Sequence, residues 1–274
     1  MENAVRGSRQ TDRGFRSGRL WKGKVVMGKY ILEVCVDCAE SAEAAAKGGA
    51  DRVELCGNLV IGGTTPETDL FEKIRSLTDI KINVLIRPRY GDFLYTDYEF
   101  DIICRSVERF RKLGANGVVI GCLCPDGSLD MERMKRLVEL AGPIDVTLHR
   151  AFDMCRDPYE ALEQAKELGI RTILTSGQQE SSWAGRELLA GLVKESGGKV
   201  DIMAGGGVNA QIIRSLLPLT GCTSYHMSGK EVLDSRMEYR RQEVSMGVPG
   251  MGEYEIFRTS QAKVKEARDV LDEA

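Results

Sequence analysis

The sequence predicts a single α/β domain folded as a (β/α)8 barrel of the TIM type. Short runs of β-branched residues alternate with helical stretches from residue 30 onward, and eight such pairs fit within about 245 residues. Several expected helices have recognisable ends, such as Asp157-Pro158 at one start and Gly114, Gly169 and Gly197 after three others. A doubly wound open sheet is the alternative, but it usually has fewer strands, and no G-x-G-x-x-G motif follows the first run.

Each expected element is defined by its own run of residues. The strands are expected at residues 31–37, 52–56, 82–88, 117–121, 145–152, 172–177, 201–207 and 223–229. The helices are expected at 41–49, 66–77, 97–113, 130–141, 157–168, 183–194, 209–217 and, with a weaker pattern, 260–271. The barrel domain is expected to span residues 27–274. In such barrels the functional residues lie at the C-terminal ends of the strands, where we look for them.

Composition narrows the class of protein. The chain has 274 residues, 42% of them hydrophobic and 29% charged, and no run approaches the roughly 18 apolar residues of a membrane helix. The net charge is −3, yet residues 1–26 contain seven basic and only two acidic residues, so the remainder is acidic. The net negative charge of the residues after 26 argues against nucleic-acid binding as the main function. Residues 1–26 lack periodicity and are expected to form a disordered basic extension.

Cysteine usage points to a reducing compartment. Eight cysteines occur at irregular spacings, and the chain has no apolar signal segment of the secretory kind. Free thiols, with room for a soft-metal site, are therefore expected rather than a disulfide framework. The sequence thus predicts a cytoplasmic protein.

Alternation along the first two expected strands turns polar side chains toward the barrel interior. Glu33 and Cys35 share one face of the first strand, and Glu54 and Cys56 share one face of the second. Their β-branched and leucine neighbours belong against the helices. Barrel interiors are normally filled by branched apolar side chains, so this polar interior is unusual.

The chain has two histidines, His149 and His226, and both occur at the ends of expected strands. Histidine is the side chain best suited to proton transfer near neutral pH. We take His149 as a candidate acid/base, with Glu33 and Glu54 sharing or orienting the proton and Arg87 holding an oxyanion. The alternative is a structural network of buried charges, although such networks are costly to bury.

Cys35 and Cys56 form a second candidate site. If the first two strands are neighbours and in register, their backbones lie about 4.8 Å apart, and two inward thiols at matching depth could share one ion. Thiolates select soft metals such as Cu(I). The alternative is that both cysteines are small buried hydrophobic residues.

A glycine-rich turn follows the seventh expected strand. Gly205, Gly206 and Gly207 lead into a helix there, and Ser228 and Gly229 follow the eighth strand. Barrels often hold a phosphate between these two loops, because glycines let backbone N–H groups approach an anion at a helix N-terminus. A phosphate or carboxylate site is expected here, with a merely tight turn as the alternative.

A series of longer motifs carries a family resemblance. They are GGADRVELC at 48–56, GGTTP at 62–66, IRPR at 86–89 with GDF at 91–93, HRAFD at 149–153, LTSG at 174–177 and MAGGG at 203–207. Together they resemble the copper homeostasis protein CutC family. The resemblance extends from residue 30 to near residue 245.

The resemblance implies a cytoplasmic TIM-type barrel that is commonly dimeric and associated with copper handling. It also implies Cys35 and Cys56 as Cu(I) ligands, and no firmly assigned reaction. The chain departs from the family pattern at Ile61, where relatives often have glutamate, so no role is assigned to a carboxylate there. Tyr90 replaces a usual glycine.

Two functions of different classes therefore remain. The first is a copper homeostasis protein that binds Cu(I) through Cys35 and Cys56 at the barrel mouth. The second is an enzyme that acts on a small anionic, phosphorylated metabolite by His/Glu acid–base chemistry. The expected partners are a copper ion or a small anion, and a second copy of the chain in a homodimer. Neither nucleic acid nor a membrane is an expected partner. A structural or partner-binding protein is the third option.

Overall fold

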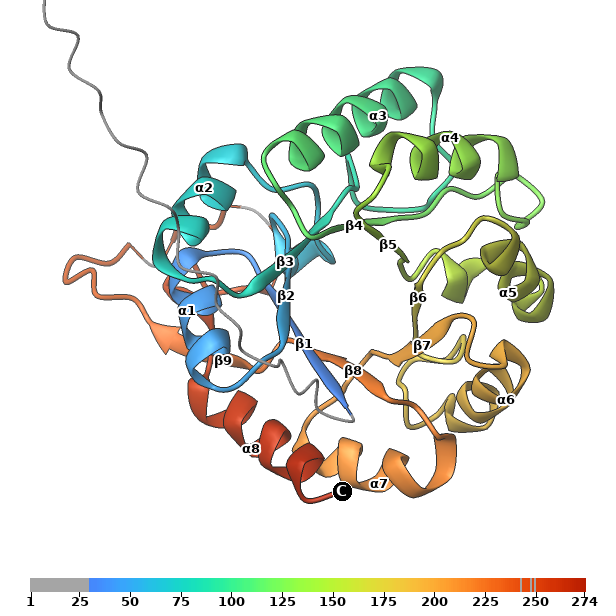
Figure 1. Ribbon diagram of the computed structural model, residues 1–274. Helices are drawn as coiled ribbons and strands as arrows, with labels where there is room; N and C mark the ends of the chain where they lie inside the picture. Colours follow the sequence, from blue (N-terminus) through green and yellow to red (C-terminus); the bar gives the residue numbers. More distant parts are fainter. Residues whose placement is uncertain (1–29, 242, 247, 249) are drawn as a thin grey trace, which may run out of the picture.

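A closed barrel of eight parallel strands forms the centre of the computed structural model, which describes residues 30–241, 243–246, 248 and 250–274 (Figure 1). The strands are β1 Ile31–Val36, β2 Arg52–Leu55, β3 Lys81–Leu85, β4 Gly117–Ile120, β5 Asp145–Leu148, β6 Thr172–Thr175, β7 Asp201–Ala204 and β8 Ser224–Met227. Strand β1 pairs with both β2 and β8, which closes the barrel. The expected extension at residues 1–26 lies outside the described residues.

Helices form an outer ring around this barrel (Figure 1). They are α1 Ala39–Lys47, α2 Thr68–Leu77, α3 Asp97–Lys112, α4 Met131–Ala141, α5 Pro158–Glu167, α6 Arg186–Ser196, α7 Ala210–Thr220 and α8 Gln261–Asp272. Two 3-10 turns, η1 Leu59–Ile61 and η2 Phe152–Met154, follow β2 and β5. The prediction of a (β/α)8 barrel is confirmed. Across the described ranges, none of the helices has the length and apolar character needed to cross a bilayer.

Local sequence signals set most helix boundaries. The Asp157 side chain accepts hydrogen bonds from two backbone N–H groups at the start of α5, with Pro158 as the first helical residue. Gly197 ends α6 with a φ of 58°, a left-handed conformation that glycine adopts without strain. Helix α6 begins three residues later than predicted. Gly185 is the N-cap residue of α6, and this position requires glycine, since a Cβ there would be 2.0 Å from the Ser176 carbonyl oxygen.

The predicted alternation of side chains is confirmed in the barrel wall. Apolar residues of β1 and β2, such as Leu32, Val34 and Val53, are fully buried in the core between the strands and the helices. The residues of opposite parity are buried inside the barrel, and many of them are polar: Glu33, Glu54, Asn83, Thr147 and Ser224. The helix-facing core therefore stabilises the barrel, and the interior is free to hold polar groups.

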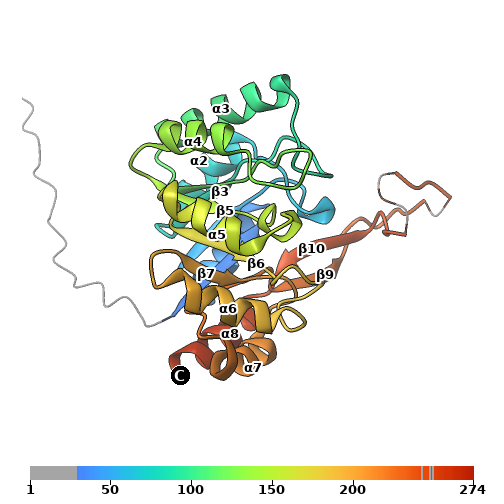
Figure 2. The same cartoon turned by 90° about the vertical axis from the view of Figure 1, so that its right-hand side faces the viewer.

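An antiparallel hairpin between β8 and α8 was not predicted. Its strands are β9 Lys230–Asp234 and β10 Glu255–Thr259, and it projects from the barrel (Figure 2). Its first strand is largely exposed and rich in charged residues, so the sequence carries no strand pattern of the half-buried kind. The base of the hairpin is fixed to the barrel, because the Thr259 N–H donates to Ser41 Oγ (3.0 Å) and the Thr259 hydroxyl donates to the Ser228 carbonyl (3.1 Å).

Replacement Ser41→Ala is expected to destabilise the fold by about 1–2 kcal/mol, because it leaves the buried Thr259 N–H without its acceptor. The free energy of unfolding in urea measures this. Ser76→Ala is the matched control, since the Ser76 hydroxyl is exposed and donates only to a carbonyl of its own helix. The control is expected to change stability by less than about 0.5 kcal/mol. Equal effects of the two substitutions would contradict the role given to Ser41.

Candidate functional site

A cavity of about 240 Å³ opens at the C-terminal ends of the barrel strands, and we call it the mouth cavity. Five of the candidate residues from the sequence line it: Cys35, Glu54, Cys56, Arg87 and His149. The remaining lining residues are Leu59, Gly62, Leu85, Phe93, Arg150, Leu174 and His226. The structure thus brings together most of the candidate acid–base and thiol groups at the predicted face of the barrel.

The Glu33 carboxylate is buried inside the barrel, next to residues that line this cavity. In the strand register it is opposite both Arg52 on β2 and His226 on β8. Arg52 Nε donates to Glu33 Oε2 (2.5 Å), Asn83 Nδ2 donates to the same oxygen (3.3 Å), and His226 Nδ1 lies 2.8 Å from Oε1. Burial alone would raise the pKa of Glu33, but Arg52 and His226 outweigh it and lower the pKa to about 2. Glu33 is therefore an anion at neutral pH.

His226 lies between the Glu33 carboxylate and the cavity. Its Nδ1 faces Glu33, and its Nε2 lies 3.6 Å from Glu54 Oε2. Burial lowers the pKa of His226, but Cys35, Glu33 and Glu54 outweigh it and raise the pKa well above its usual value. The sequence places His226 at the end of an expected strand but does not single it out as a candidate. Its parity with Ser224 on an alternating strand was the signal that would have placed it inside the barrel.

Glu54 faces the cavity next to the His226 ring. Burial raises its pKa most, His226 lowers it and Glu33 raises it again, so the pKa of Glu54 reaches about 7. A carboxyl group with such a pKa both donates and accepts a proton near neutrality. Glu54 and His226 together form a pair that is able to exchange a proton with a bound molecule.

His149 lies on the opposite wall and is buried, with its ring 4.8 Å from that of Phe93. The Ala151 N–H donates to His149 Nδ1 (3.1 Å), so the neutral ring carries its proton on Nε2. This Nε2 is buried and has no hydrogen-bond partner. Burial, reinforced by the charge of Arg87, lowers the pKa of His149 to about 3. His149 is therefore a neutral hydrogen-bond donor at physiological pH.

The expected pairing of His149 with the two carboxylates is wrong. Glu33 and Glu54 contact His226 instead, because β8 closes the barrel beside β1. His149 on the far wall has only Arg87 as a charged influence on its pKa. The two histidines consequently have opposite protonation states within one cavity.

The two candidate thiols lie in one small apolar cluster with Leu85 and Val119. Their expected matching depth is wrong, because the register places Cys35 opposite Glu54, whereas Cys56 lies just beyond the end of β2. The Cys56 thiol donates to the Glu54 carbonyl (3.7 Å), and the Cys35 thiol donates to the Met227 carbonyl (3.6 Å). Burial, Glu54 and Cys35 raise the pKa of Cys56 well above its usual value. Within the described part of the chain, no three His, Cys, Asp or Glu side chains are grouped as metal ligands.

Arg87 lies two residues beyond β3, over the ring of Phe93 at 5.0 Å. Its guanidinium donates to the carbonyls of Gly62 (3.1 Å) and Gly63 (3.2 Å), and to that of Gly91 (2.6 Å). Arg87 therefore ties two loops together and also presents positive charge to the mouth cavity.

Arg150 is a second cation at this rim that the sequence reasoning missed. Its Nε pairs with Asp153 (2.6 Å), and its Nη2 donates to Ser176 Oγ (2.9 Å). Asp153 also accepts from the Ser176 and Gln178 backbone N–H groups, which locks the loop after β5 to the loop after β6. The position of Arg150 directly after His149 was the available signal.

The two loops of the expected anion site have different hydrogen-bond partners. The Gly206 carbonyl accepts from the backbone and hydroxyl of Ser182 (2.9 and 3.0 Å), in the loop after β6. The carbonyls of Ser228 and Gly229 accept instead from Thr259 and Ser260 at the hairpin base. Anion binding by Gly205, Gly206, Gly207, Ser228 and Gly229 stays a prediction.

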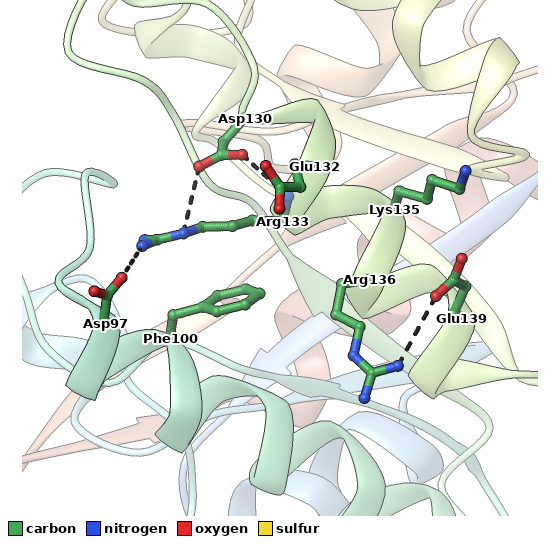
Figure 3. Close-up of a pocket in the computed structure, with 8 residues that line it drawn as sticks. All are labelled: Asp97, Phe100, Asp130, Glu132, Arg133, Lys135, Arg136 and Glu139. Carbon is green, nitrogen blue, oxygen red and sulfur yellow. Dashed lines mark hydrogen bonds and ion pairs between the residues drawn. The ribbon is translucent and has the colours of Figure 1, made fainter.

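A groove of about 560 Å³ on the outer surface, between α3 and α4, is a different kind of feature (Figure 3). Arg133 lies over the ring of Phe100 (4.8 Å) and pairs with Asp97 (2.6 Å) and Asp130 (3.5 Å). The two arginines of this groove, Arg133 and Arg136, are thus each paired with carboxylates. The candidate residues from the sequence all lie elsewhere, so the mouth cavity remains the candidate functional site.

Comparisons with known proteins agree with this architecture. Residues 30–231 match the CutC family. The chain belongs to the CutC family. A family protein CutC from Parabacteroides distasonis is 46% identical over 86% of this chain and 98% of its own length. The human copper homeostasis protein cutC homolog is 39% identical, over 86% of this chain and 87% of its own length.

Solved structures extend the same conclusion. The crystal structure of CutC from Streptococcus agalactiae superposes with a TM-score of 0.70 at 29% identity, over 73% of this chain and 98% of that one. Thiamine phosphate pyrophosphorylase from Pyrococcus furiosus superposes with a TM-score of 0.53 at 19% identity, over 90% and 97%. The second likeness shows a shared barrel fold alone. The chain is thus a member of the CutC copper homeostasis family with a polar barrel mouth.

Substitution His149→Asn is expected to reduce the loss of folding stability that occurs as the pH falls below neutrality. The pKa of His149 is about 3 in the folded state against an ordinary 6.5, so the unfolded chain binds the proton more readily between these values. The contribution of neutral His149 to the free energy of unfolding is complete above pH 6.5. It is lost as the pH falls toward 3, by up to about 1.4 kcal/mol per pH unit. Urea unfolding at about pH 7 and about pH 5 measures this. The wild type is expected to lose about 2 kcal/mol more than the variant. Equal losses would contradict the buried neutral state.

Proposed function

We propose that the mouth cavity binds a small anionic, phosphorylated metabolite and carries out acid–base chemistry on it. The buried, unpartnered Nε2–H of His149, a residue that lines the cavity, is the observation that carries the proposal. A buried donor without an acceptor costs about 1–3 kcal/mol, and a bound anion would supply the missing acceptor.

The charge of the lining supports an anion. Arg87, Arg150 and His226 line the cavity, and Glu54 is the carboxylate among its lining residues. Guanidinium groups bind phosphate and carboxylate oxygens with charge-assisted hydrogen bonds. In this proposal the two arginines hold the anionic group and His149 donates to an oxygen of the ligand.

The proton-transfer roles follow from position. Glu54 and His226 lie together on the wall opposite His149, so a bound molecule would lie between a donor and an acid–base pair. Glu33 does not line the cavity, and its part is to orient His226 through Nδ1. Compared with the expectation from the sequence, the acid–base role passes from His149 to Glu54 and His226.

Binding of inorganic phosphate and small phosphorylated metabolites, measured by isothermal titration calorimetry, tests this proposal. Arg150→Met is expected to raise the Kd roughly tenfold or more, because a charge-assisted contact is lost. Arg136→Met is the matched control on the outer groove and is expected to leave the Kd unchanged. Glu54→Gln is expected to abolish turnover of any metabolite that binds, without weakening phosphate binding. Identical Kd values for wild type, Arg150→Met and Arg136→Met would overturn the proposal.

A second candidate function is Cu(I) binding through Cys35 and Cys56. Both thiols are buried in one apolar cluster and both line the mouth cavity, which is the observation that favours it. The donor set fits the metal, because soft thiolates select Cu(I) over harder ions. The name of the human relative refers to copper homeostasis. All eight cysteines are free thiols, which supports the cytoplasmic location that this function requires.

An anaerobic Cu(I) titration against a competing chelator tests the copper proposal. The double variant Cys35→Ser/Cys56→Ser is expected to lose binding of one equivalent, whereas Cys104→Ser/Cys124→Ser, which alters two thiols outside the mouth cavity, is expected to retain it. Affinity is expected to rise with pH, because the Cys56 thiol has a raised pKa and must lose its proton to bind the metal. Weak binding that is the same in all three proteins would exclude this site.

A further inference from the structure

A second cavity, of about 410 Å³, adjoins the mouth cavity, and we call it the vestibule. Cys35 and Leu59 line both cavities, so the two spaces share a wall at the turn after β2. The outer side of the vestibule is formed by Val60 of that turn and by the hairpin, including Met251 and Phe257. The vestibule therefore lies between this shared wall and the hairpin.

Contacts among its lining residues and with neighbouring elements hold the wall of the vestibule in place. The Leu59 N–H donates to Asp37 Oδ2 (3.2 Å), which fixes the turn to the end of β1. Arg258 donates to the Phe257 carbonyl (2.9 Å), and the Lys230 ammonium lies 4.4 Å from the centre of the Phe257 ring. With Thr259 bound to α1 and to the loop after β8, the hairpin base forms a fixed side of the vestibule.

This wall combines apolar and cationic groups. The Val60 side chain is 48% exposed, and Phe257 and Met251 are only partly buried, although each faces a cavity. Apolar groups left in contact with water gain free energy when a ligand covers them. Lys230 and Arg258 add two positive charges against the single negative charge of Asp37. An apolar or aromatic group attached to an anion matches this combination.

We propose that the vestibule binds the aromatic or aliphatic body of an elongated organic anion, whose phosphate or carboxylate lies in the mouth cavity. This inference rests on the proposed anion-binding function and names its substrate class. A small inorganic or sugar-sized anion would occupy the mouth cavity alone. A molecule that extends past Leu59 also covers Val60 and Phe257, and so gains the free energy of burying them.

Two synthetic probes separate the cavities: propyl phosphate and 3-phenylpropyl phosphate, which differ only by the ring. Calorimetry on the full chain is expected to give a Kd roughly tenfold lower for the phenyl compound, because burial of the ring adds affinity. Val60→Trp fills the vestibule without changing charge. This variant is expected to lose the tenfold preference and to keep the wild-type affinity for propyl phosphate.

The control variant is Val244→Trp, which places the same side chain at a comparably exposed valine outside the vestibule and is expected to retain the preference. If both probes bind wild type with the same affinity, the vestibule proposal is overturned and the anion site stands. If the preference survives in Val60→Trp, the ring binds elsewhere and the vestibule proposal is also overturned. If neither probe binds, the proposed anion-binding function itself fails.

Discussion

The buried carboxylate of Glu33 is the constraint on which the rest of the barrel interior depends. A charge removed from water costs several kcal/mol unless it is paired with good geometry. Its partners, Arg52 and His226, lie directly opposite it on the two neighbouring strands. These partners are present only when β1 pairs with β2 and β8 at once. Compensation of the charge and closure of the barrel are therefore the same structural event, and the helix-facing apolar core provides the free energy for both.

This arrangement divides the mouth cavity into two chemically different walls. On one side the Glu33 anion holds a charged His226 beside Glu54, and on the other a neutral His149 lies against Phe93 with its buried Nε2–H unpartnered. The candidate copper ligands line the same cavity. A molecule bound by the acid–base groups would cover the thiols. The proposed anion and the proposed copper ion would therefore compete for one site.

The hairpin between β8 and α8 adds one wall of the vestibule to the barrel. Loops that follow barrel strands carry specificity in this fold, whereas the strands and helices carry stability. The match to the CutC family covers residues 30–231, and the hairpin residues of the vestibule wall, such as Met251 and Phe257, lie beyond it. If the vestibule binds part of a ligand as proposed, the connection before α8 contributes contacts that lie outside the family match.

Alternation along each strand is a local property, and the sequence by itself determined it. It predicted the barrel, the inward direction of Glu33, Glu54 and Cys35, and the position of His149 at a strand end. The tertiary structure alone decided the strand register, which placed Cys35 opposite Glu54, and the neighbour of β1, which gave the carboxylates to His226. Side-chain parity follows from backbone geometry within a few residues. Register and closure instead depend on the packing of the whole barrel and join residues far apart in the chain, such as Glu33 and His226.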